Sequence, residues 1–259
     1  LFWSGNFIVG KFAFLDRHLN RLFAGLAAAD IPLEMTREDV TGVLRETIER
    51  NNMDDGVHVR LMITRGDKKT PSQHPSNVVG GPNVVIIAEH KQADPEVADI
   101  GVNLFTATVR RPAPDMLDQQ LNCHSKLHEV IALIQAVHAG ADEALMLDPT
   151  GAVATCNATN FFIVRNGIVH TSTGQYNLNG ITRQVVLETA EAAQIPTRQA
   201  PFSLTDVYAA EEAFVTGTFG GLTPVTEVDG RTIGESAPGP MTRRLRGLYE
   251  DAVAASVSQ

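Results

Sequence analysis

The hydrophobic pattern of the first 98 residues alternates between the periods of strands and of helices. The run Leu1-Phe-Trp is typical of the inside of a strand, so we expect an N-terminal piece to precede it. Asp16 is expected to cap a first helix. Thr36 with Asp39 resembles a capping box at the start of a second helix. The pattern predicts a small α/β domain.

Two further strands are expected at 57–64 and 84–89, separated by a polar loop. The next stretch, 90–98, is polar, contains a proline and has no clear period, so we expect it to be a linker. The sequence therefore predicts a small domain over residues 1–98 and a larger domain over residues 99–259.

From residue 100 the pattern changes to many short strands joined by turns. The pairs Asn166-Gly167 and Asp229-Gly230 lie between apolar runs and are strong hairpin signals, and Asp148-Pro-Thr-Gly151 is a third turn. Three helices are expected to interrupt these strands, at about 125–139, 182–193 and 240–254. A mixed sheet is the expected structure of this domain, so the chain is expected to be mixed α/β.

Composition narrows the class of function. The 259 residues carry a net charge of -9 with no stripe dense in lysine and arginine, which argues against a nucleic-acid partner. No apolar run approaches the ~20 residues that cross a bilayer, so we expect no membrane contact and a cytoplasmic protein. His124 and His128 lie beside Cys123 without a third ligand at comparable spacing, so no metal site is expected. A small-molecule substrate is the default.

Four separated segments carry candidate chemistry. They are Asp16-Arg-His-Leu-Asn-Arg-Leu22, His124-Ser-Lys126, Asn179-Gly-Ile-Thr-Arg183 and Val215-Thr-Gly-Thr218. Each alone has a purely structural explanation, such as a surface arginine, a helix start or a strand end. Their combination, rather than any one of them, is what carries the functional signal.

The order and spacing of these segments, with Gly140–Asp148 and Asn160–Gly167 between them, resemble the class IV aminotransferases. That family covers branched-chain and D-amino acid aminotransferases, (R)-selective amine transaminases and aminodeoxychorismate lyases. The resemblance runs from about Phe2 to Tyr249. It implies a two-domain fold of fold type IV like that of D-amino acid aminotransferase, a pyridoxal 5'-phosphate cofactor and a homodimer.

The resemblance assigns a phosphate site residue by residue. Arg21 falls in a His-x-x-Arg-Leu pattern, where a guanidinium fork suits a phosphate dianion. Gly180, Ile181 and Thr182 are assigned to a helix start, whose N–H groups and dipole attract anions. Gly217 and Thr218 are assigned to a loop that completes the site. Such a site anchors the cofactor without choosing a reaction.

Lys126 is the expected catalytic and cofactor-binding lysine, because of the five lysines it alone precedes an apolar helix in the matching segment. An alignment without gaps from Gly140 nevertheless places Asn122 where the family keeps its lysine. If this stretch is helical, four residues make about one turn, ~6 Å along one face, and Lys126 can enter the same cavity. A four-residue deletion in the following helix is the alternative.

Further pocket residues also follow from the resemblance. Thr155 stands where the family typically carries the glutamate that keeps the pyridine nitrogen protonated, and a hydroxyl can only hydrogen-bond that nitrogen. His124 and Phe219 are expected to line the substrate pocket. Arg110, with Arg111 beside it, is a candidate for a substrate carboxylate contact.

The resemblance implies transfer of an amino group from a small-molecule amino donor to a keto acceptor. Two alternatives stay open. One is a lyase of the aminodeoxychorismate type, which shares the cofactor site. The other is a non-catalytic homologue that keeps the phosphate site, because Asn122 and Thr155 both depart from the family pattern.

Overall fold

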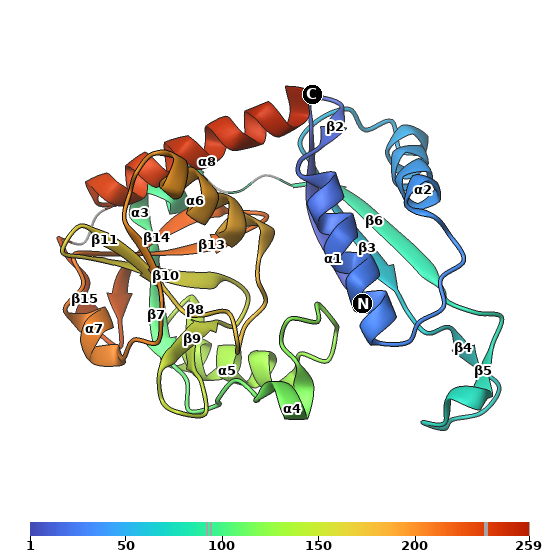
Figure 1. Ribbon diagram of the computed structural model, residues 1–259, viewed down its shortest axis with the longest axis horizontal. Helices are drawn as coiled ribbons and strands as arrows, with labels where there is room; N and C mark the ends of the chain where they lie inside the picture. Colours follow the sequence, from blue (N-terminus) through green and yellow to red (C-terminus); the bar gives the residue numbers. More distant parts are fainter. Residues whose placement is uncertain (92, 94, 236–237, 259) are drawn as a thin grey trace. The chain divides into compact units, whose positions relative to one another are not determined.

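The computed structural model describes residues 1–91, 93, 95–235 and 238–258, and it separates them into two compact units (Figure 1). The smaller unit contains the chain up to residue 92, the segment Leu121–His124 and the last residues of the chain. The larger unit contains residues 93–120 and 125–255. The domain boundary expected at residue 98 stays a prediction.

The smaller unit is built on a four-stranded antiparallel sheet. Its strands lie in the order β2 (Lys11–Phe12), β1 (Phe2–Ile8), β3 (Val57–Ile63) and β6 (Val84–His90). The helices α1 (Leu15–Ala28) and α2 (Arg37–Arg50) bury their apolar stripes against it, with Leu22 and Leu44 in the core beside Trp3. A small ribbon of β4 (Asp67–Lys68) and β5 (Val78–Val79) flanks the 3₁₀ turn Pro75–Asn77. The strands expected at 57–64 and 84–89 are confirmed.

The two expected helix caps have different outcomes. Thr36 accepts a hydrogen bond from the backbone N–H of Asp39, whose carboxylate accepts the N–H of Thr36, so the capping box is confirmed. The Asp16 cap is wrong, because α1 begins after Phe14, whose left-handed φ of 52° turns the chain out of β2. Asp16 instead lies in the first helical turn, where its charge faces the positive end of the helix dipole.

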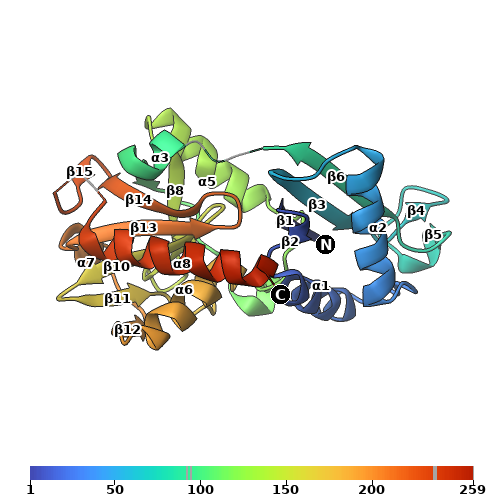
Figure 2. The ribbon, with the colours of Figure 1, turned by 90° about the horizontal axis from the view of Figure 1, so that it is seen from above.

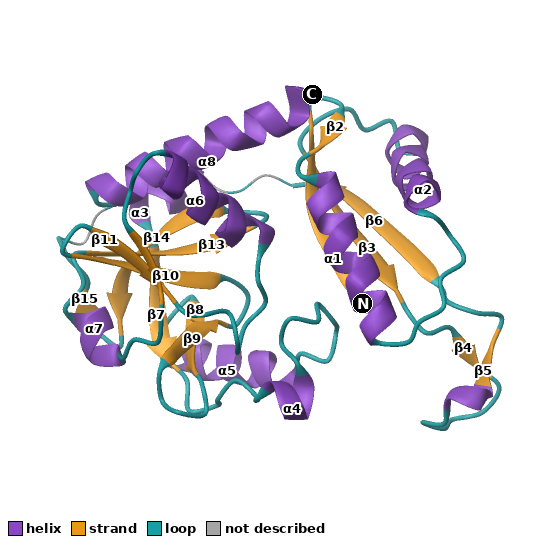
Figure 3. Ribbon diagram, in the orientation of Figure 1, coloured by secondary structure: helices purple, strands orange, loops and turns teal. Residues whose placement is uncertain are grey.

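The larger unit is built on a nine-stranded mixed sheet (Figures 2 and 3). Its main path is β12 (Thr197–Gln199), β11 (Ile168–Thr171), β10 (Asn160–Arg165), β13 (Glu212–Gly217), β14 (Gly221–Val228), β7 (Val102–Thr106), β8 (Glu143–Leu147) and β9 (Val153–Cys156), and β15 (Arg231–Thr232) pairs with β14. Three of its pairings are parallel, β11 with β12, β14 with β7 and β7 with β8. The mixed sheet is therefore confirmed.

The expected hairpins form where the sequence places them. Asn166 and Gly167 have φ angles of 51° and 70° and join β10 to β11, with Arg165 opposite Ile168. Asp229 and Gly230, at 54° and 73°, join β14 to β15 in the same way. Two successive positive φ angles match the right-handed twist of the flanking strands, which is why these residue pairs make tight turns.

Helices cover both sides of this sheet. The longest are α5 (Leu127–His138), α6 (Ile181–Ala192) and α8 (Pro240–Ser258). Three helices are short, α3 (Pro95–Ile100), α4 (Pro114–Leu117) and α7 (Leu204–Tyr208). Figure 1 shows α6 and α8 on one side of the strands and α5 on the other. No helix in the described part of the chain is long and apolar enough to cross a membrane.

The linker expected at 90–98 is only partly irregular. Strand β6 continues to His90, and helix α3 begins at Pro95, so the expectation is wrong at both ends of the stretch. Proline is favoured in the first turn of a helix because a backbone N–H at that position would have no acceptor within the helix, so its loss costs no hydrogen bond. Residues 92 and 94 of the expected linker lie outside the described residues.

Candidate active site

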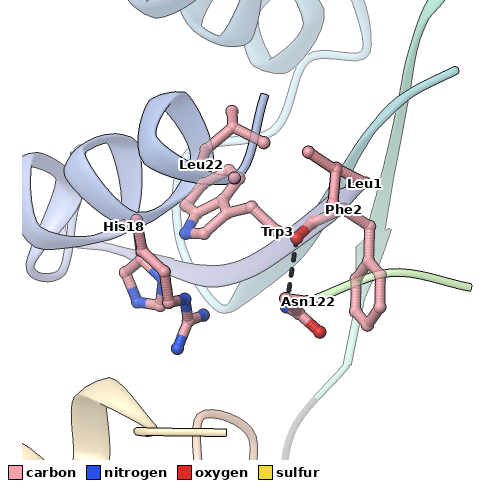
Figure 4. Close-up of a pocket in the computed structure, with 8 residues that line it drawn as sticks. Leu1, Phe2, Trp3, His18, Leu22 and Asn122 are labelled. Carbon is pink, nitrogen blue, oxygen red and sulfur yellow. Dashed lines mark hydrogen bonds between the residues drawn. The ribbon is translucent and has the colours of Figure 1, made fainter. Parts of the chain in front are cut away.

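Arg21 lies on α1 in the smaller unit, at a pocket that it lines with His18, Trp3 and Asn122 (Figure 4). Burial lowers the pKa of the Arg21 guanidinium to about 10. His18, one turn earlier, is buried, and its pKa lies well below the usual value because of burial and, second, the charge of Arg21. This side of the pocket therefore combines one cation with a neutral imidazole.

Asn122, which an alignment without gaps is expected to place opposite the family lysine, is hydrogen-bonded to the first strand. Its backbone oxygen accepts the N–H of Phe2 at 3.0 Å, and its side-chain Nδ2 donates to the Phe2 oxygen at 3.0 Å. The predicted pocket residue His124 meets the Phe2 ring edge-on, with the ring centres 4.6 Å apart. The segment Leu121–His124 thus serves as an extension of the smaller unit.

Lys126 lies in the larger unit, immediately before helix α5. Residues 121–126 are not helical, so the expectation that four residues make one turn of a shared face is wrong. The backbone oxygen of Asn122 accepts the N–H of Phe2 on β1. It is therefore not available for the hydrogen bond to residue 126 that a helix would need. Lys126 is instead the N-cap residue of α5, and its Nζ donates to Glu129 Oε2 at 2.6 Å.

The sequence did not single out Glu129, which joins Lys126 to a second cation. Its Oε1 accepts Nη1 of Arg111 at 2.6 Å, and both side chains are almost fully buried, with 7% and 3% exposed. Arg111 Nε donates to the backbone oxygen of Tyr176. A glutamate three residues after a lysine in an otherwise apolar helix was the available signal. Arg110, the predicted carboxylate contact, is exposed.

Thr155 is buried on β9, and its hydroxyl is already engaged. Oγ1 donates to the backbone oxygen of Thr159 at 2.7 Å and accepts Nδ2 of Asn160 at 3.4 Å. The hydroxyl proton therefore points into the protein, and the oxygen keeps one further lone pair as an acceptor.

Asn160 connects Thr155 to the start of α6. Its Nδ2 also donates to the Leu178 oxygen at 2.9 Å, and a Cβ built on Gly180 would lie 2.4 Å from its Oδ1. Only glycine fits at position 180, since any other side chain would collide with the amide. The N-cap residue Gly180 has no side chain, and among the described residues no side-chain cap hydrogen bond forms at this helix start.

Thr182 and the turn after β13 complete this group of residues. Thr182 is buried, with its Oγ1 3.4 Å from the hydroxyl of Tyr249, and a Cβ on Gly221 would meet the same tyrosine ring at 3.3 Å. Gly217 ends β13 beside Thr159, and a turn over 218–220 carries Thr218 and the half-buried Phe219. Asn160 thus connects Thr155 to Gly180, and Tyr249 connects Thr182 to Gly221, which pairs with Gly217.

The loop before α6 is fixed from two directions. The buried Arg183 donates to the Asn179 side chain and to the Ser172 backbone oxygen, and Arg111 holds Tyr176 from the other side. Burial lowers the pKa of Arg183. The linked side chains of Lys126, Glu129 and Arg111 are consequently connected to the start of α6 through the loop that contains Tyr176. No sequence pattern indicates this connection.

Comparison with known proteins identifies the family. The family model described as amino-transferase class IV matches residues 4–228. The chain is 38% identical over 251 residues to branched-chain-amino-acid aminotransferase-like protein 2 of Arabidopsis thaliana, covering 96% of this chain but only 44% of that protein, so it spans less than half of this relative. It is 35% identical over 238 residues to a putative branched-chain-amino-acid aminotransferase of Methanocaldococcus jannaschii, covering 92% and 81%.

Solved structures agree with these relatives. The branched-chain aminotransferase of the archaeon Thermoproteus uzoniensis, solved with norvaline, superposes with a TM-score of 0.88 at 27% identity, over 99% of this chain and 86% of that one. Another branched-chain amino acid aminotransferase, solved with pyridoxamine 5'-phosphate, gives a TM-score of 0.91 at 27% identity, over 99% and 85%. The order of segments that the sequence displays, the mixed fold and the family model all agree. This chain belongs to the class IV aminotransferase family.

Proposed function

We propose that this chain is a pyridoxal-phosphate-dependent aminotransferase that moves an amino group between an amino acid or amine and a keto acid. The observation that carries the proposal is the start of α6, where glycine at position 180 and a buried Thr182 leave uncapped N–H groups. A helix N-terminus of this kind binds a phosphate dianion through its N–H groups and its dipole. Family membership supports the same assignment.

These residues fit the phosphate end of pyridoxal 5'-phosphate. Gly180, Ile181 and Thr182 would hold the phosphate together with Gly217 and Thr218, and Arg21 stays a proposed cofactor-binding residue. When bound, the cofactor supplies an aldehyde that condenses with amines and a ring that withdraws electrons from the substrate. The partly buried cation of Arg21 is suited to a doubly charged anion.

The other proposed residues act on protons and on orientation. Lys126 would attach the cofactor through its amine and then carry a proton to and from the substrate carbon. Thr155 would accept a hydrogen bond rather than donate one, because its proton is committed to Thr159. His124, Phe219 and Arg110 stay proposed substrate contacts.

Borohydride reduction after incubation with pyridoxal 5'-phosphate, followed by peptide mapping, tests the proposal. We expect a pyridoxyl adduct on the peptide of Lys126, absent from Lys126→Arg and retained in the control Lys91→Arg. Amino exchange would then be measured with leucine, isoleucine, valine and D-alanine as donors and 2-oxoglutarate as acceptor. Pyruvate released from aminodeoxychorismate without an acceptor would favour the lyase instead, and no adduct on any lysine would refute covalent transamination.

A specific observation favours a second candidate, a non-catalytic homologue that binds phosphate compounds. Asn122 stands at the family lysine position, and Lys126 is paired with Glu129. Equilibrium dialysis with pyridoxal 5'-phosphate, combined with the reduction above, separates the two: binding without a reducible adduct supports the homologue. Asn122→Lys then asks whether an amine at position 122 is enough to create an adduct there.

We propose a homodimer that forms through α5. One face of this helix packs Ala132 and Ala136 on β8, while the opposite face exposes Leu127, Val130, Ile131, Ile134 and Val137, each between 41% and 72% exposed. A continuous apolar stripe of this kind is typical of an interface. Light scattering should show a dimer that Ile134→Glu converts to monomer and the control Arg45→Glu on α2 does not; a monomeric parent would contradict it.

We further propose a cytoplasmic location. The net charge of -9 and the small-molecule chemistry of the family are consistent with it. Cell fractionation of the full-length protein is the test, and recovery in another compartment would contradict it.

A further inference from the structure

The amine of Lys126 is held by an ion pair. Nζ lies 2.6 Å from Glu129 Oε2, across one turn at the start of α5. The other carboxylate oxygen of Glu129 binds Arg111 Nη1 at 2.6 Å. Of the three side chains, only Lys126 reaches solvent, with 35% of its side chain exposed against 7% and 3% for the other two.

The pairing has a fixed geometry. Arg111 donates its Nε to the Tyr176 oxygen at 3.0 Å, which anchors the carboxylate to the loop that leads into α6. His128 precedes Glu129 on α5, and its Nε2 lies 4.0 Å from Glu129 Oε1 and 3.0 Å from the Gln119 side-chain oxygen. Burial first and the Arg111 charge second lower the pKa of His128, which favours its neutral imidazole. Arg111 is therefore the permanent partner of Glu129.

This pairing opposes the chemistry that the proposed function asks of Lys126. A lysine attacks a carbonyl carbon through its nitrogen lone pair, so Nζ must leave Oε2 and lose a proton to water or buffer first. The carboxylate cannot follow the amine as it moves, because its other oxygen is bound to the buried Arg111 at 2.6 Å. The ion pair therefore has to open before the amine reacts.

We infer that Glu129 is a positioning residue that holds the Lys126 amine in an ion pair and so limits the reaction of this lysine with aldehydes. The inference rests on the proposed role of Lys126 in the function above. Glu129, three residues after Lys126 on α5, fixes the position of Nζ. Arg111 in turn connects Glu129 to the loop before α6. Opening this contact is the step that precedes attachment.

Acetic anhydride labelling without cofactor tests the inference directly. At pH 8, peptide mass spectrometry gives the labelling rate of Lys126 relative to the exposed Lys69. We expect the ratio to rise about fivefold in Glu129→Gln. The control His128→Asn keeps both ion pairs, and its ratio should stay within about twofold of the parent protein.

A second variant guards against misfolding. Glu129→Gln leaves the buried Arg111 without its counter-charge, whereas the double variant Arg111→Leu with Glu129→Leu removes both charges together. Lys126 should label about fivefold faster in the double variant as well, with the circular dichroism spectrum of the parent. An unchanged labelling ratio in a folded variant would overturn the role of Glu129.

Reduction of the same proteins with borohydride after addition of pyridoxal 5'-phosphate separates this inference from the proposed function. A faster-forming Lys126 adduct in both variants supports the two together. Adducts that form at equal rates in parent and variants overturn the control by Glu129. If no protein yields an adduct, the covalent function fails, while the acetylation ratio still decides whether Glu129 restrains the amine.

Discussion

The starts of α6 and α5 are both helix N-termini in the larger unit, yet they are built in opposite ways. The start of α6 is made of backbone N–H groups, a position that only glycine can fill and neutral side chains such as Thr182 and Asn160. The start of α5 is made of three charged side chains, Lys126, Glu129 and Arg111. The first therefore offers main-chain donors, and the second offers charged side chains.

The difference teaches which kind of site a short sequence motif can specify. An anion-binding site made of main-chain N–H donors needs a glycine and a helix start, and residues close together in the sequence determine both. A reactive lysine depends on the charges around it, and here those charges come from residues 18 positions apart along the chain. We therefore expect the two helix starts to respond differently to substitution.

The largest expected effect is at the charged start. Glu129→Leu leaves Arg111 buried without a counter-charge, and we expect it to lower the free energy of unfolding by about 3–5 kcal/mol. The double variant Arg111→Leu with Glu129→Leu should lie much closer to the parent. Urea denaturation measures both, and a double variant as unstable as the single one would show that charge is not the cause.

A pH dependence comes from Glu143 on β8, whose carboxylate accepts the hydroxyl of Thr159, the residue before Asn160, at 2.5 Å. Burial raises the pKa of Glu143 from 4.5 to about 7. Because the folded state holds this proton more tightly, its contribution to stability is complete below pH 4.5 and is lost as the pH rises to 7. We expect a loss of about 2–3 kcal/mol over that range.

Denaturation of parent and Glu143→Gln between about pH 4.5 and 8 measures this contribution. The glutamine variant cannot titrate at this position, so its stability should fall less with pH. Parallel curves for the two proteins would mean that Glu143 has an ordinary pKa.

The steric requirement at the neutral start gives the next effect. Gly180→Ala would place a Cβ 2.4 Å from the Asn160 side-chain oxygen, so we expect a loss of about 1–3 kcal/mol in the free energy of unfolding. Gly42→Ala on α2 is the matched control, because nothing lies within 4 Å of its Cβ and alanine favours a helix. Equal thermal midpoints for the parent and Gly180→Ala would show that the helix start yields without cost.

The smallest expected change in stability is that of Thr182→Val, which removes a hydroxyl that makes one long contact with Tyr249. Its effect should appear in ligand affinity, with binding of pyridoxal 5'-phosphate weakened about tenfold by loss of one hydrogen bond to an anion. Thr189→Val, on the same helix but bonded to the Val185 backbone, is the control. Isothermal titration calorimetry compares them, and equal weakening in both would exclude a specific contact.

Much of the fold could be predicted from local patterns. The capping box at Thr36 and the turns at Asn166 and Asp229 were predicted correctly because side chains and φ preferences within four residues decide them. The short helices α3, α4 and α7 were not predicted, since helices of four to six residues show too little periodicity. The mixed α/β class and the family are both confirmed.

The candidate site could be predicted only in part. The neutral start of α6 followed from the segment Asn179–Arg183, whereas Glu129 was missed because a single acidic residue on a helix is usually a solvated one. The non-helical course of residues 121–126 was missed for another reason. It depends on pairing with Phe2, 120 positions away, which no local pattern reports.

The sequence by itself determined the family, the order of the main strands and helices and the helix start that suits a phosphate, because each rests on short-range geometry. Only the tertiary structure decided that Lys126 is bound to Glu129, that Arg111 rather than Arg110 is buried, and that the Thr155 hydroxyl donates its hydrogen bond to the Thr159 backbone oxygen. The physical reason is that burial, ion pairing and hydrogen bonding depend on which distant segments meet in the folded chain, and no local pattern reports which segments these are.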